Sequence, residues 1–330
     1  MNKRDVIHHI TGAARAPAQS SGRGRAPANI ALVKYWGKRD DELNLPVTSS
    51  LSVSLGHLGT ETIIEPASRD EFILNGQPVP EDTGFAGRLR AYLDLFRSPP
   101  APAGFHVITH NSIPTAAGLA SSASGYAALA LALNDLFAWK LPPRDLSILA
   151  RLGSGSASRS VYCGFAVWHA GTRADGMDSF AEPLQATWPE LRVGLLKVSV
   201  AEKSISSRDA MKRTVATSPL YKAWPDQVAR DLATVTSAIA TRDFERLGQT
   251  AEQNALAMHA TAIAAWPSAL FWLPESVKAM HRIWQIRADG LPVYFTMDAG
   301  PNLKLITTAN HIEALQRQLH DVEWVAPFAA

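Results

Sequence analysis

Small and hydroxylated residues dominate one stretch of the chain, residues 111–133, which reads NSIPTAAGLASSASGYAALALAL. Pro114 cannot lie inside a helix, whereas Ser121 and Ser122 are good cap residues, so a buried, Ala-rich helix is predicted to begin near them. The start of a helix presents unpaired N–H groups and the positive end of its dipole, which suits a phosphate. Gly118 allows close approach of the backbone to an anion. The Walker pattern is missing, so a well-capped Ala-rich helix is the alternative interpretation.

A second small, hydroxylated segment covers residues 153–160 and contains Ser154, Ser156 and Arg159. Two serines and an arginine at this spacing can present several donors to one phosphate group, and the guanidinium can bind it with two hydrogen bonds. The alternative is an ordinary Gly/Ser loop.

An apolar strand at residues 28–33 ends in a dense polar and aromatic cluster: Lys34, Tyr35, Trp36, Lys38 and Arg39. The cations can bind a polyanion while the aromatic rings fix the geometry. The alternative is a strand end with solvated lysines.

Two more polar segments follow predicted strands in the second half of the chain. Residues 203–208 form a polar turn after a strand at 191–200, and Asp298 ends the β run at 292–297. An aspartate before Ala-Gly-Pro is most often a turn former, so Asp298 alone does not identify a site.

Hydrophobic periodicity predicts the elements that carry these residues. Further strands are predicted at 51–55, 60–64, 105–109, 161–169 and 322–328, with a hairpin at 72–77. Helices are predicted at 85–96, 144–152, 226–241, 243–260, 275–288 and 312–320. The composition changes at residues 183–189 and predicts two domains, 27–186 and 187–330.

Bulk composition limits the function classes. A chain of 330 residues with 46% hydrophobic and 19% charged residues is long enough for two globular domains. A net charge of +2 predicts neither nucleic-acid wrapping nor membrane attachment. Cys163 is the single cysteine, so neither an intramolecular disulfide nor a cysteine-based metal site can form, and a reducing compartment is expected.

The first 26 residues are basic and contain a single acid, Asp5, against Lys3, Arg4, Arg15, Arg23 and Arg25. This composition resembles an organelle transit peptide, and a flexible N-terminal extension has the same composition. We expect residues 1–26 to be a flexible extension outside the fold, with order beginning near Pro27.

Together these segments resemble a known family. The loop from Pro114 to Ser124 resembles the phosphate loop of the GHMP kinase superfamily, which includes galactokinase, homoserine kinase and mevalonate kinase. Six segments, in order from about residue 27 to the C-terminus, resemble the mevalonate diphosphate decarboxylase family: 28–38, 114–123, 153–159, 207–208, 258–260 and 298–302. The length of the chain resembles that of the shorter bacterial members. The Lys-Tyr-Trp-Gly-Lys and Asp-Ala-Gly-Pro-Asn sequences are highly specific, whereas the loop alone indicates the superfamily.

The resemblance implies ATP-dependent decarboxylation of mevalonate 5-diphosphate to isopentenyl diphosphate, with release of ADP, phosphate and CO₂. Asp298 would orient or deprotonate the 3-hydroxyl, and Lys34 would stabilise charge nearby. Ser121 would assist Mg²⁺ binding and phosphoryl transfer. Arg159 would hold the substrate carboxylate with support from Asn29.

The resemblance also implies two sets of binding residues. ATP phosphates would contact Pro114, Ala116, Ala117, Gly118, Leu119, Ala120, Ser121 and Ser122. The substrate would contact Tyr35, Trp36, Lys38, Ser154, Ser156, Arg159, Ser207, Arg208 and Ala299. His259 would be a packed residue of the second domain.

The implied fold is α+β in two domains, a ribosomal S5 domain 2-like N-terminal half and a ferredoxin-like C-terminal half, with ATP bound between them. A cytoplasmic homodimer that binds neither nucleic acid nor membrane is expected. A decarboxylase of mevalonate 5-phosphate, a mevalonate 3-kinase and a non-catalytic ATP-binding sensor are the rival hypotheses.

Overall fold

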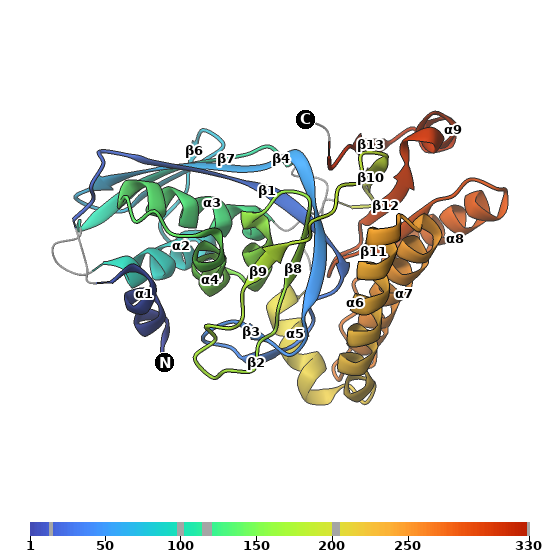
Figure 1. Cartoon of the computed structure of the whole chain (residues 1–330), viewed down its shortest axis with the longest axis horizontal. Coiled ribbons are helices and arrows are strands. Elements are labelled where there is room, and N and C mark those ends of the chain that lie inside the picture. Colours follow the sequence, from blue (N-terminus) through green and yellow to red (C-terminus); the bar gives the residue numbers. More distant parts are fainter. Residues whose placement is uncertain (13–15, 98–101, 114–120, 200–204, 329–330) are drawn as a thin grey trace.

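The described part of the chain builds two main sheets, one from each half, and helices pack on both (Figure 1). The computed structural model describes residues 1–12, 16–97, 102–113, 121–199 and 205–328. Helices and mainly antiparallel sheets make up each half, as the predicted α+β class requires, although β5 and β7 of the N-terminal sheet pair in parallel. The predicted domain boundary after residue 186 falls between the last strand of one sheet and the first strand of the other, and it stays a prediction.

The N-terminal sheet has the strand order β6-β5-β7-β4-β8-β9, with β1 also paired to β4. Its strands are β1 (Gly22–Val33), β4 (Ser50–Ala67), β5 (Glu71–Leu74), β6 (Gln77–Pro78), β7 (Gly104–Asn111), β8 (Phe165–Trp168) and β9 (Ala181–Pro183). A separate short hairpin joins β2 (Lys38–Asp40) and β3 (Leu45–Pro46). The hairpin predicted at 72–77 is confirmed, and its turn is formed by Asn75 and Gly76, which both have positive φ between β5 and β6.

The helices of this half are α1 (Lys3–Thr11), α2 (Gly84–Leu93), α3 (Ser121–Leu136) and α4 (Pro143–Gly153), with 3₁₀ turns η1 (Asp94–Phe96) and η3 (Gly155–Val161). Helix α3 is described from Ser121, where its start was predicted. Its backbone lies directly on β1: a Cβ atom at Gly22 would come 2.2 Å from the Ala132 carbonyl oxygen, and one at Gly24 would come 2.1 Å from that of Ala128. Glycine is therefore required on this face of β1.

The prediction that residues 1–26 lie outside the fold is wrong for most of that segment. Val6 and Ile7 of α1 are buried in the core of the N-terminal half, and β1 begins at Gly22 rather than near Pro27. From Gly22 to Arg25 the strand alternates buried glycine with exposed arginine. The inward face thus consists of residues without side chains, so the sequence shows basic charge but no apolar alternation.

The C-terminal sheet is antiparallel with strand order β11-β12-β10-β13. Its strands are β10 (Leu191–Leu196), β11 (Tyr294–Met297), β12 (Leu303–Thr308) and β13 (Val322–Val325). Its helices are α5 (Ser207–Thr217), α6 (Trp224–Thr241), α7 (Phe244–Ile263), α8 (Pro274–Ala288) and α9 (Ile312–Gln318), with 3₁₀ turns η4 (Tyr221–Ala223) and η5 (Ala309–His311). Helix α7 packs against both β1 and β11, and so joins the two halves.

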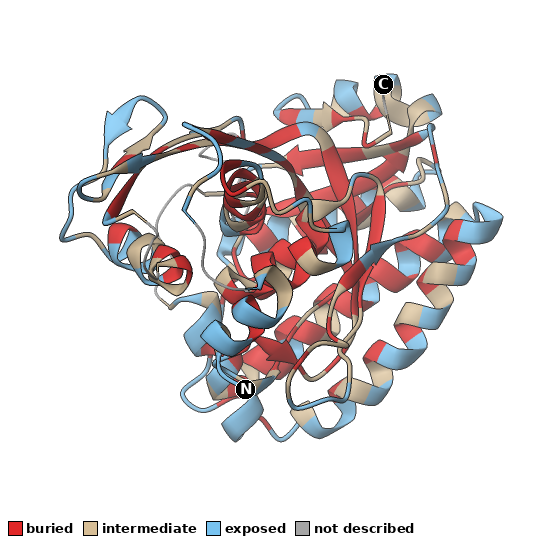
Figure 2. Cartoon of the chain, turned by 60° about the vertical axis from the view of Figure 1, so that its left-hand side comes forward, coloured by how far each residue is buried: buried red, intermediate tan, exposed pale blue. Residues whose placement is uncertain are grey.

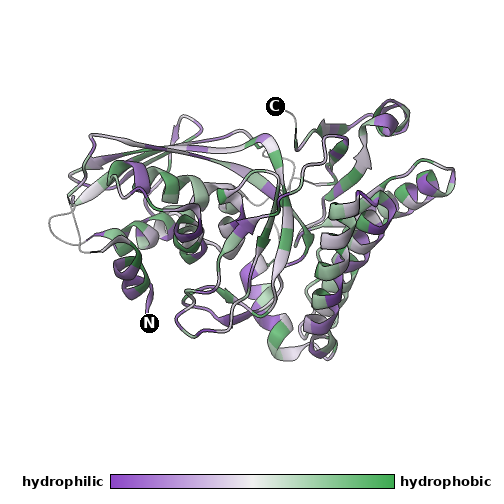
Figure 3. Ribbon diagram, viewed as in Figure 1, coloured by the Kyte–Doolittle hydropathy of each residue, from purple (hydrophilic) through white to green (hydrophobic). Residues whose placement is uncertain are grey.

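Buried residues follow the inner faces of the helices and both sheets, and exposed residues cover the outside (Figure 2). Hydrophobic and hydrophilic residues alternate along the helices, as amphipathic packing requires (Figure 3). No helix within the described ranges is long and apolar enough to cross a membrane.

Candidate active site

A cavity of about 240 Å³ lies where the two halves meet. Its walls come from the end of β1, the β2–β3 hairpin, η3, the start of α3, the first turn of α5, α7 and the residues after β11. Most predicted site residues line it: Asn29, Lys34, Tyr35, Trp36, Lys38, Ser122, Ser154, Ser156, Arg159, Ser207, Arg208, Asp298 and Ala299. Segments far apart in the sequence therefore converge on one site.

Positive charge dominates this cavity. Its described lining contains four cations, Lys34, Lys38, Arg159 and Arg208, and one acid, Asp298. A buried excess of cations is stable when an anion completes the site. A larger, open hollow of about 700 Å³ lies along α7, but its one lining arginine, Arg287, is paired with Glu252. The smaller cavity is therefore the candidate site for a polyanion.

Asp298 and Lys34 form the centre of the cavity. The Lys34 Nζ donates to Asp298 Oδ1 at 2.9 Å and to the Ala31 carbonyl oxygen at 2.8 Å. The Lys34 backbone N–H donates to Asn254 Oδ1 on α7 at 2.7 Å. Burial lowers the pKa of Lys34 to about 8, although the Asp298 carboxylate opposes this shift. The Asp298 carboxylate thus meets an ammonium group that gives up its proton more readily than that of an ordinary lysine.

Sequence reasoning missed Lys304, which lies behind this pair. The Lys304 Nζ is 3.6 Å from Asp298 Oδ2 and 3.4 Å from the Asn302 carbonyl oxygen, and the side chain is 2% exposed. The signal was present, because Lys304 interrupts an apolar strand between Leu303 and Leu305. A lysine on the buried face of a strand needs an anionic or polar partner.

Two polar side chains hold Arg159 in the cavity wall. Its Nη1 donates to Ser50 Oγ at 2.6 Å and its Nη2 donates to Asn29 Oδ1 at 3.3 Å. The Asn29 Nδ2 donates in turn to Ser160 Oγ at 2.7 Å. The expected contact between Asn29 and Arg159 is therefore present. Burial lowers the pKa of Arg159 to about 10, and its Nε finds no partner among the described residues.

The β2–β3 hairpin contributes Lys38 and Asn44 to the cavity wall. The Lys38 Nζ donates to Asn44 Oδ1 at 2.7 Å. Asn44 also lines the cavity, and its Nδ2 donates to the carbonyl oxygens of Arg151 and Leu152 at 2.9 and 3.1 Å. Burial and the nearby Arg208 charge lower the pKa of Lys38. Asn44 was not predicted as a site residue, because an asparagine in a loop is common in any sequence. The structure shows it buried, with a left-handed backbone (φ 53°).

The aromatic residues of the predicted cluster differ in position. Tyr35 lines the cavity, burial raises the pKa of its hydroxyl, and that hydroxyl has no hydrogen-bond partner among the described residues. The Trp36 indole is 2% exposed and packs edge-on against Phe271. The Trp36 carbonyl oxygen accepts from Tyr221 Oη and Trp224 Nε1, both at 3.0 Å. Trp36 therefore anchors the segment, while Tyr35 presents a free donor to the site.

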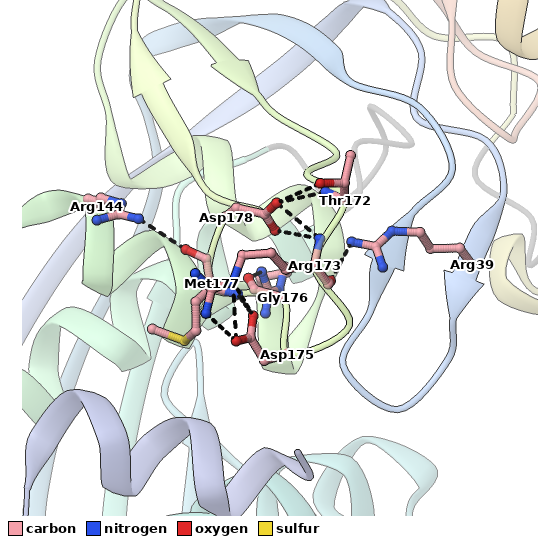
Figure 4. Close-up of polar contacts among 9 residues, drawn as sticks. Arg39, Arg144, Thr172, Arg173, Asp175, Gly176, Met177 and Asp178 are labelled. Atoms are coloured by element: carbon pink, nitrogen blue, oxygen red, sulfur yellow. Dashed lines mark hydrogen bonds and ion pairs between the residues drawn. The ribbon is translucent and has the colours of Figure 1, made fainter.

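Arg39 lies away from the cavity. Neighbouring residues of a strand point to opposite faces, so Lys38 faces the cavity while Arg39 extends to the loop at residues 170–178 (Figure 4). The Arg39 Nη2 donates to the carbonyl oxygens of Ala170 and Arg173 at 3.3 and 3.1 Å. Asp178 closes this loop by accepting from the backbone N–H groups of Thr172 and Arg173. Arg39 thus supports the loop and is not part of the anion site.

The predicted phosphate loop is described only at its end. Pro114, Ala116, Ala117, Gly118, Leu119 and Ala120 lie outside the described residues, and the Ser121 side chain is not described. Ser122 is exposed and lines both the central cavity and a second cavity of about 140 Å³. The second cavity is bordered by Phe85, Arg88, Leu89, Thr109, Gly125, Tyr126 and Leu129. The start of α3 therefore stands between two adjoining hollows.

His259 on α7 is packed beneath the central pair. It is 1% exposed, its Nε2 lies 3.2 Å from the Asp298 carbonyl oxygen, and its ring contacts Phe271 and Trp272. Burial, with the Lys34 charge, lowers the pKa of His259 to about 3. The imidazole is therefore neutral and supports the backbone at Asp298.

This buried histidine predicts a measurable pH dependence of stability. Because its pKa is lower in the folded chain than the unperturbed 6.5, protonation of the unfolded chain lowers stability as the pH falls from 6.5 towards 3. Between pH 7.5 and pH 5, we expect the free energy of unfolding to fall by about 2 kcal/mol less in His259→Gln than in the parent protein. Urea unfolding at both pH values measures this difference. The exposed His320→Gln variant is the control, and equal pH slopes for all three proteins would contradict the assignment.

Comparison with known proteins agrees with this arrangement. Two family models match: a diphosphomevalonate decarboxylase-like N-terminal domain over residues 26–181 and a mevalonate 5-diphosphate decarboxylase C-terminal domain over residues 194–325. Diphosphomevalonate decarboxylase mvd1 of Aspergillus fumigatus is 40% identical, over 84% of this chain and 74% of its own length.

Solved structures are similar over nearly the whole chain. Mevalonate diphosphate decarboxylase from Enterococcus faecalis is 44% identical, with a TM-score of 0.86 over 93% of this chain and 96% of that one. A structure described as a complex with MVAPP, AMPPCP and magnesium is 43% identical, with the same TM-score and coverage. The two-domain fold of these enzymes, that of the GHMP kinase superfamily, is thus confirmed for this chain. The chain belongs to the diphosphomevalonate decarboxylase family.

Proposed function

We propose that the protein converts mevalonate 5-diphosphate to isopentenyl diphosphate at the expense of ATP, releasing ADP, phosphate and CO₂. The observation that carries this proposal is the cavity whose described lining contains four cations and one carboxylate, Asp298, which is ion-paired to Lys34. Such a site matches a substrate with a diphosphate, a carboxylate and a hydroxyl group. Family membership and the similar structure described as a complex with MVAPP, AMPPCP and magnesium support the same substrate and cofactor.

Different charged residues of the cavity would bind the diphosphate and the carboxylate of the substrate. Lys38, Arg208 and the serines Ser154, Ser156 and Ser207 would bind the diphosphate, with the free Tyr35 hydroxyl as a further donor. Arg159 would hold the carboxylate, because it is buried in the cavity wall and is positioned by Asn29 and Ser50. Trp36 and Ala299 complete the wall. The 3-hydroxyl then lies between these two anchors, beside Asp298.

The first chemical step is phosphorylation of the 3-hydroxyl, since hydroxide is a poor leaving group. Asp298 would accept the proton of the 3-hydroxyl group. At the same time, the oxygen of that hydroxyl group would bond to the γ-phosphorus of ATP, and the bond between this phosphorus and ADP would break. Lys34 would stabilise the charge on the transferred group. In the second step, the electron pair of the C1–C2 bond forms the C2=C3 double bond. CO₂ leaves from C1 and phosphate leaves from C3.

The nucleotide would bind at the start of α3. We propose that the loop residues Pro114, Ala116, Ala117, Gly118, Leu119, Ala120, Ser121 and Ser122 bind the ATP phosphates. The base would occupy the second cavity, which has the aromatic residues Phe85 and Tyr126 in its wall and shares Ser122 with the first.

The residues present fit Mg²⁺ bound mainly through the nucleotide. Within the described ranges, no group of three or more His, Cys, Asp and Glu side chains is arranged to hold a metal ion, and the Asp298 carboxylate is occupied by lysines. Magnesium commonly keeps several waters and binds phosphates with one or two protein oxygens. Ser121 would supply such an oxygen. The ion would offset negative charge on the phosphates during transfer.

We also propose that the protein works as a cytoplasmic homodimer and binds no nucleic acid. The net charge of +2 and the single cysteine support this proposal. Size-exclusion chromatography with light scattering tests the dimer.

The function is tested by a turnover assay that measures ADP and CO₂ separately, with Mg²⁺ and ATP. Mevalonate, its 5-phosphate and its 5-diphosphate are supplied in turn. Equal amounts of both products with the diphosphate alone are expected. Equal products with the monophosphate would assign the monophosphate as substrate. ADP without CO₂ would identify a kinase, and nucleotide binding without ADP would identify a sensor.

A further inference from the structure

The carboxylate of Asp298 is bordered by an ammonium group on each oxygen. Lys34 Nζ is 2.9 Å from Oδ1, and Lys304 Nζ is 3.6 Å from Oδ2. Both lysines are 2% exposed, whereas the aspartate is 29% exposed and faces the cavity. The two contacts come from different elements, the end of β1 and the start of β12, so together they define the orientation of the carboxylate.

The two lysines differ in their access to the substrate. Lys34 lines the cavity, and Lys304 is not among the lining residues. Antiparallel pairing of β11 and β12 places Lys304 opposite Thr296, two residues before Asp298. Lys304 therefore approaches the carboxylate from within the sheet. A phosphoryl group in the cavity can attract Lys34 but cannot displace Lys304.

This difference matters during turnover. A lysine that turns to a phosphoryl group weakens its pairing with Asp298 at the moment when further negative charge enters the site. A carboxylate beside other anions favours protonation, and a protonated Asp298 would not accept the hydroxyl proton. A second cation, out of reach of the substrate, prevents this.

We propose that Lys304 is a positioning residue that holds Asp298 ionised and oriented while Lys34 interacts with the transferred phosphoryl group. The inference rests on the proposed role of Asp298 as acceptor of the 3-hydroxyl proton. Among the described residues, Lys34, Arg159 and the neutral His259 are further charged or titratable groups that face Asp298. Of these, Lys34 and Arg159 line the cavity and would bind substrate.

A stability cycle tests the ion pair without any assay of activity. Lys304→Met is expected to lower the melting temperature of the parent protein, because it removes a partner of Asp298. The same change is expected to raise the melting temperature of the Asp298→Asn variant, because it removes a buried ammonium group that has lost its carboxylate. If Lys304→Met shifts the melting temperature by the same sign and size in both backgrounds, the ion pair between Lys304 and Asp298 is contradicted.

The pH dependence of turnover tests the role. In Lys304→Met, the acid limb of the kcat profile should move to higher pH by about one unit, while KM for both substrates stays within about two-fold of the parent. The exposed Lys278→Met variant should leave the limb in place. A lower kcat with an unmoved acid limb would show that Lys304 only packs. If the parent protein forms no ADP, the proposed function fails, and the stability cycle alone decides whether the pair exists.

Discussion

Replacing Asp298 with asparagine is expected to abolish turnover, with kcat falling at least about 1,000-fold. Asparagine keeps the shape of the side chain but cannot accept the proton of the 3-hydroxyl. Since phosphorylation creates the leaving group for decarboxylation, ADP and CO₂ should fall together. The measurement is the two-product assay under saturating ATP, Mg²⁺ and mevalonate 5-diphosphate.

The matched control is Asp289→Asn, which removes an exposed carboxylate at the end of α8 and should leave turnover unchanged. Circular dichroism and substrate binding establish that the Asp298→Asn protein is folded. Retention of more than about a tenth of kcat would contradict the proton-acceptor role. ADP formation without CO₂ would move Asp298 from the phosphorylation step to the decarboxylation step.

The central pair shows what sequence could and could not provide. Lys34 and Asp298 are 264 residues apart, and no periodicity predicts that they meet. Each stands at the end of a predicted strand, but which ends come together depends on how α7 joins the two sheets. The resemblance to a known family predicted that Lys34 and Asp298 share one site. Hydrophobic pattern alone predicts two separate polar turns at these positions.

The extents of two strands that contain glycine, β1 and β4, differ from those predicted. In β1, Gly22 and Gly24 provide the buried face, so a strand under a helix looked like a basic, flexible tail. The β segments predicted at 51–55 and 60–64 belong to one strand, β4, which runs from Ser50 to Ala67 through Gly56 and Gly59. A Cβ atom at Gly59 would come 2.2 Å from the Ala26 carbonyl oxygen of β1, so this glycine permits close pairing rather than a break.

Replacing Lys34 with methionine is expected to lower kcat about 1,000-fold, because a preorganised charge beside the transferred phosphoryl group is lost. The wild-type pH profile should carry the signature of this lysine. Its pKa is lowered to about 8 by burial, and its function requires the protonated form. The kcat/KM profile, which reports the free enzyme, should therefore be flat just below pH 8 and fall about ten-fold per unit above it.

The Lys34→Arg variant separates charge from protonation. Arginine stays protonated throughout this pH range, so whatever activity remains should no longer decline above pH 8, although the bulkier group fits poorly in a position that is 2% exposed. The exposed Lys197→Met variant should keep the basic limb, since ionisation of the substrates is common to all variants. A basic limb near pH 8 in both the Met and Arg variants would show that it belongs to another group. Its disappearance in both, with Lys197→Met unchanged, would place the ammonium of Lys34 beside the reacting phosphoryl group.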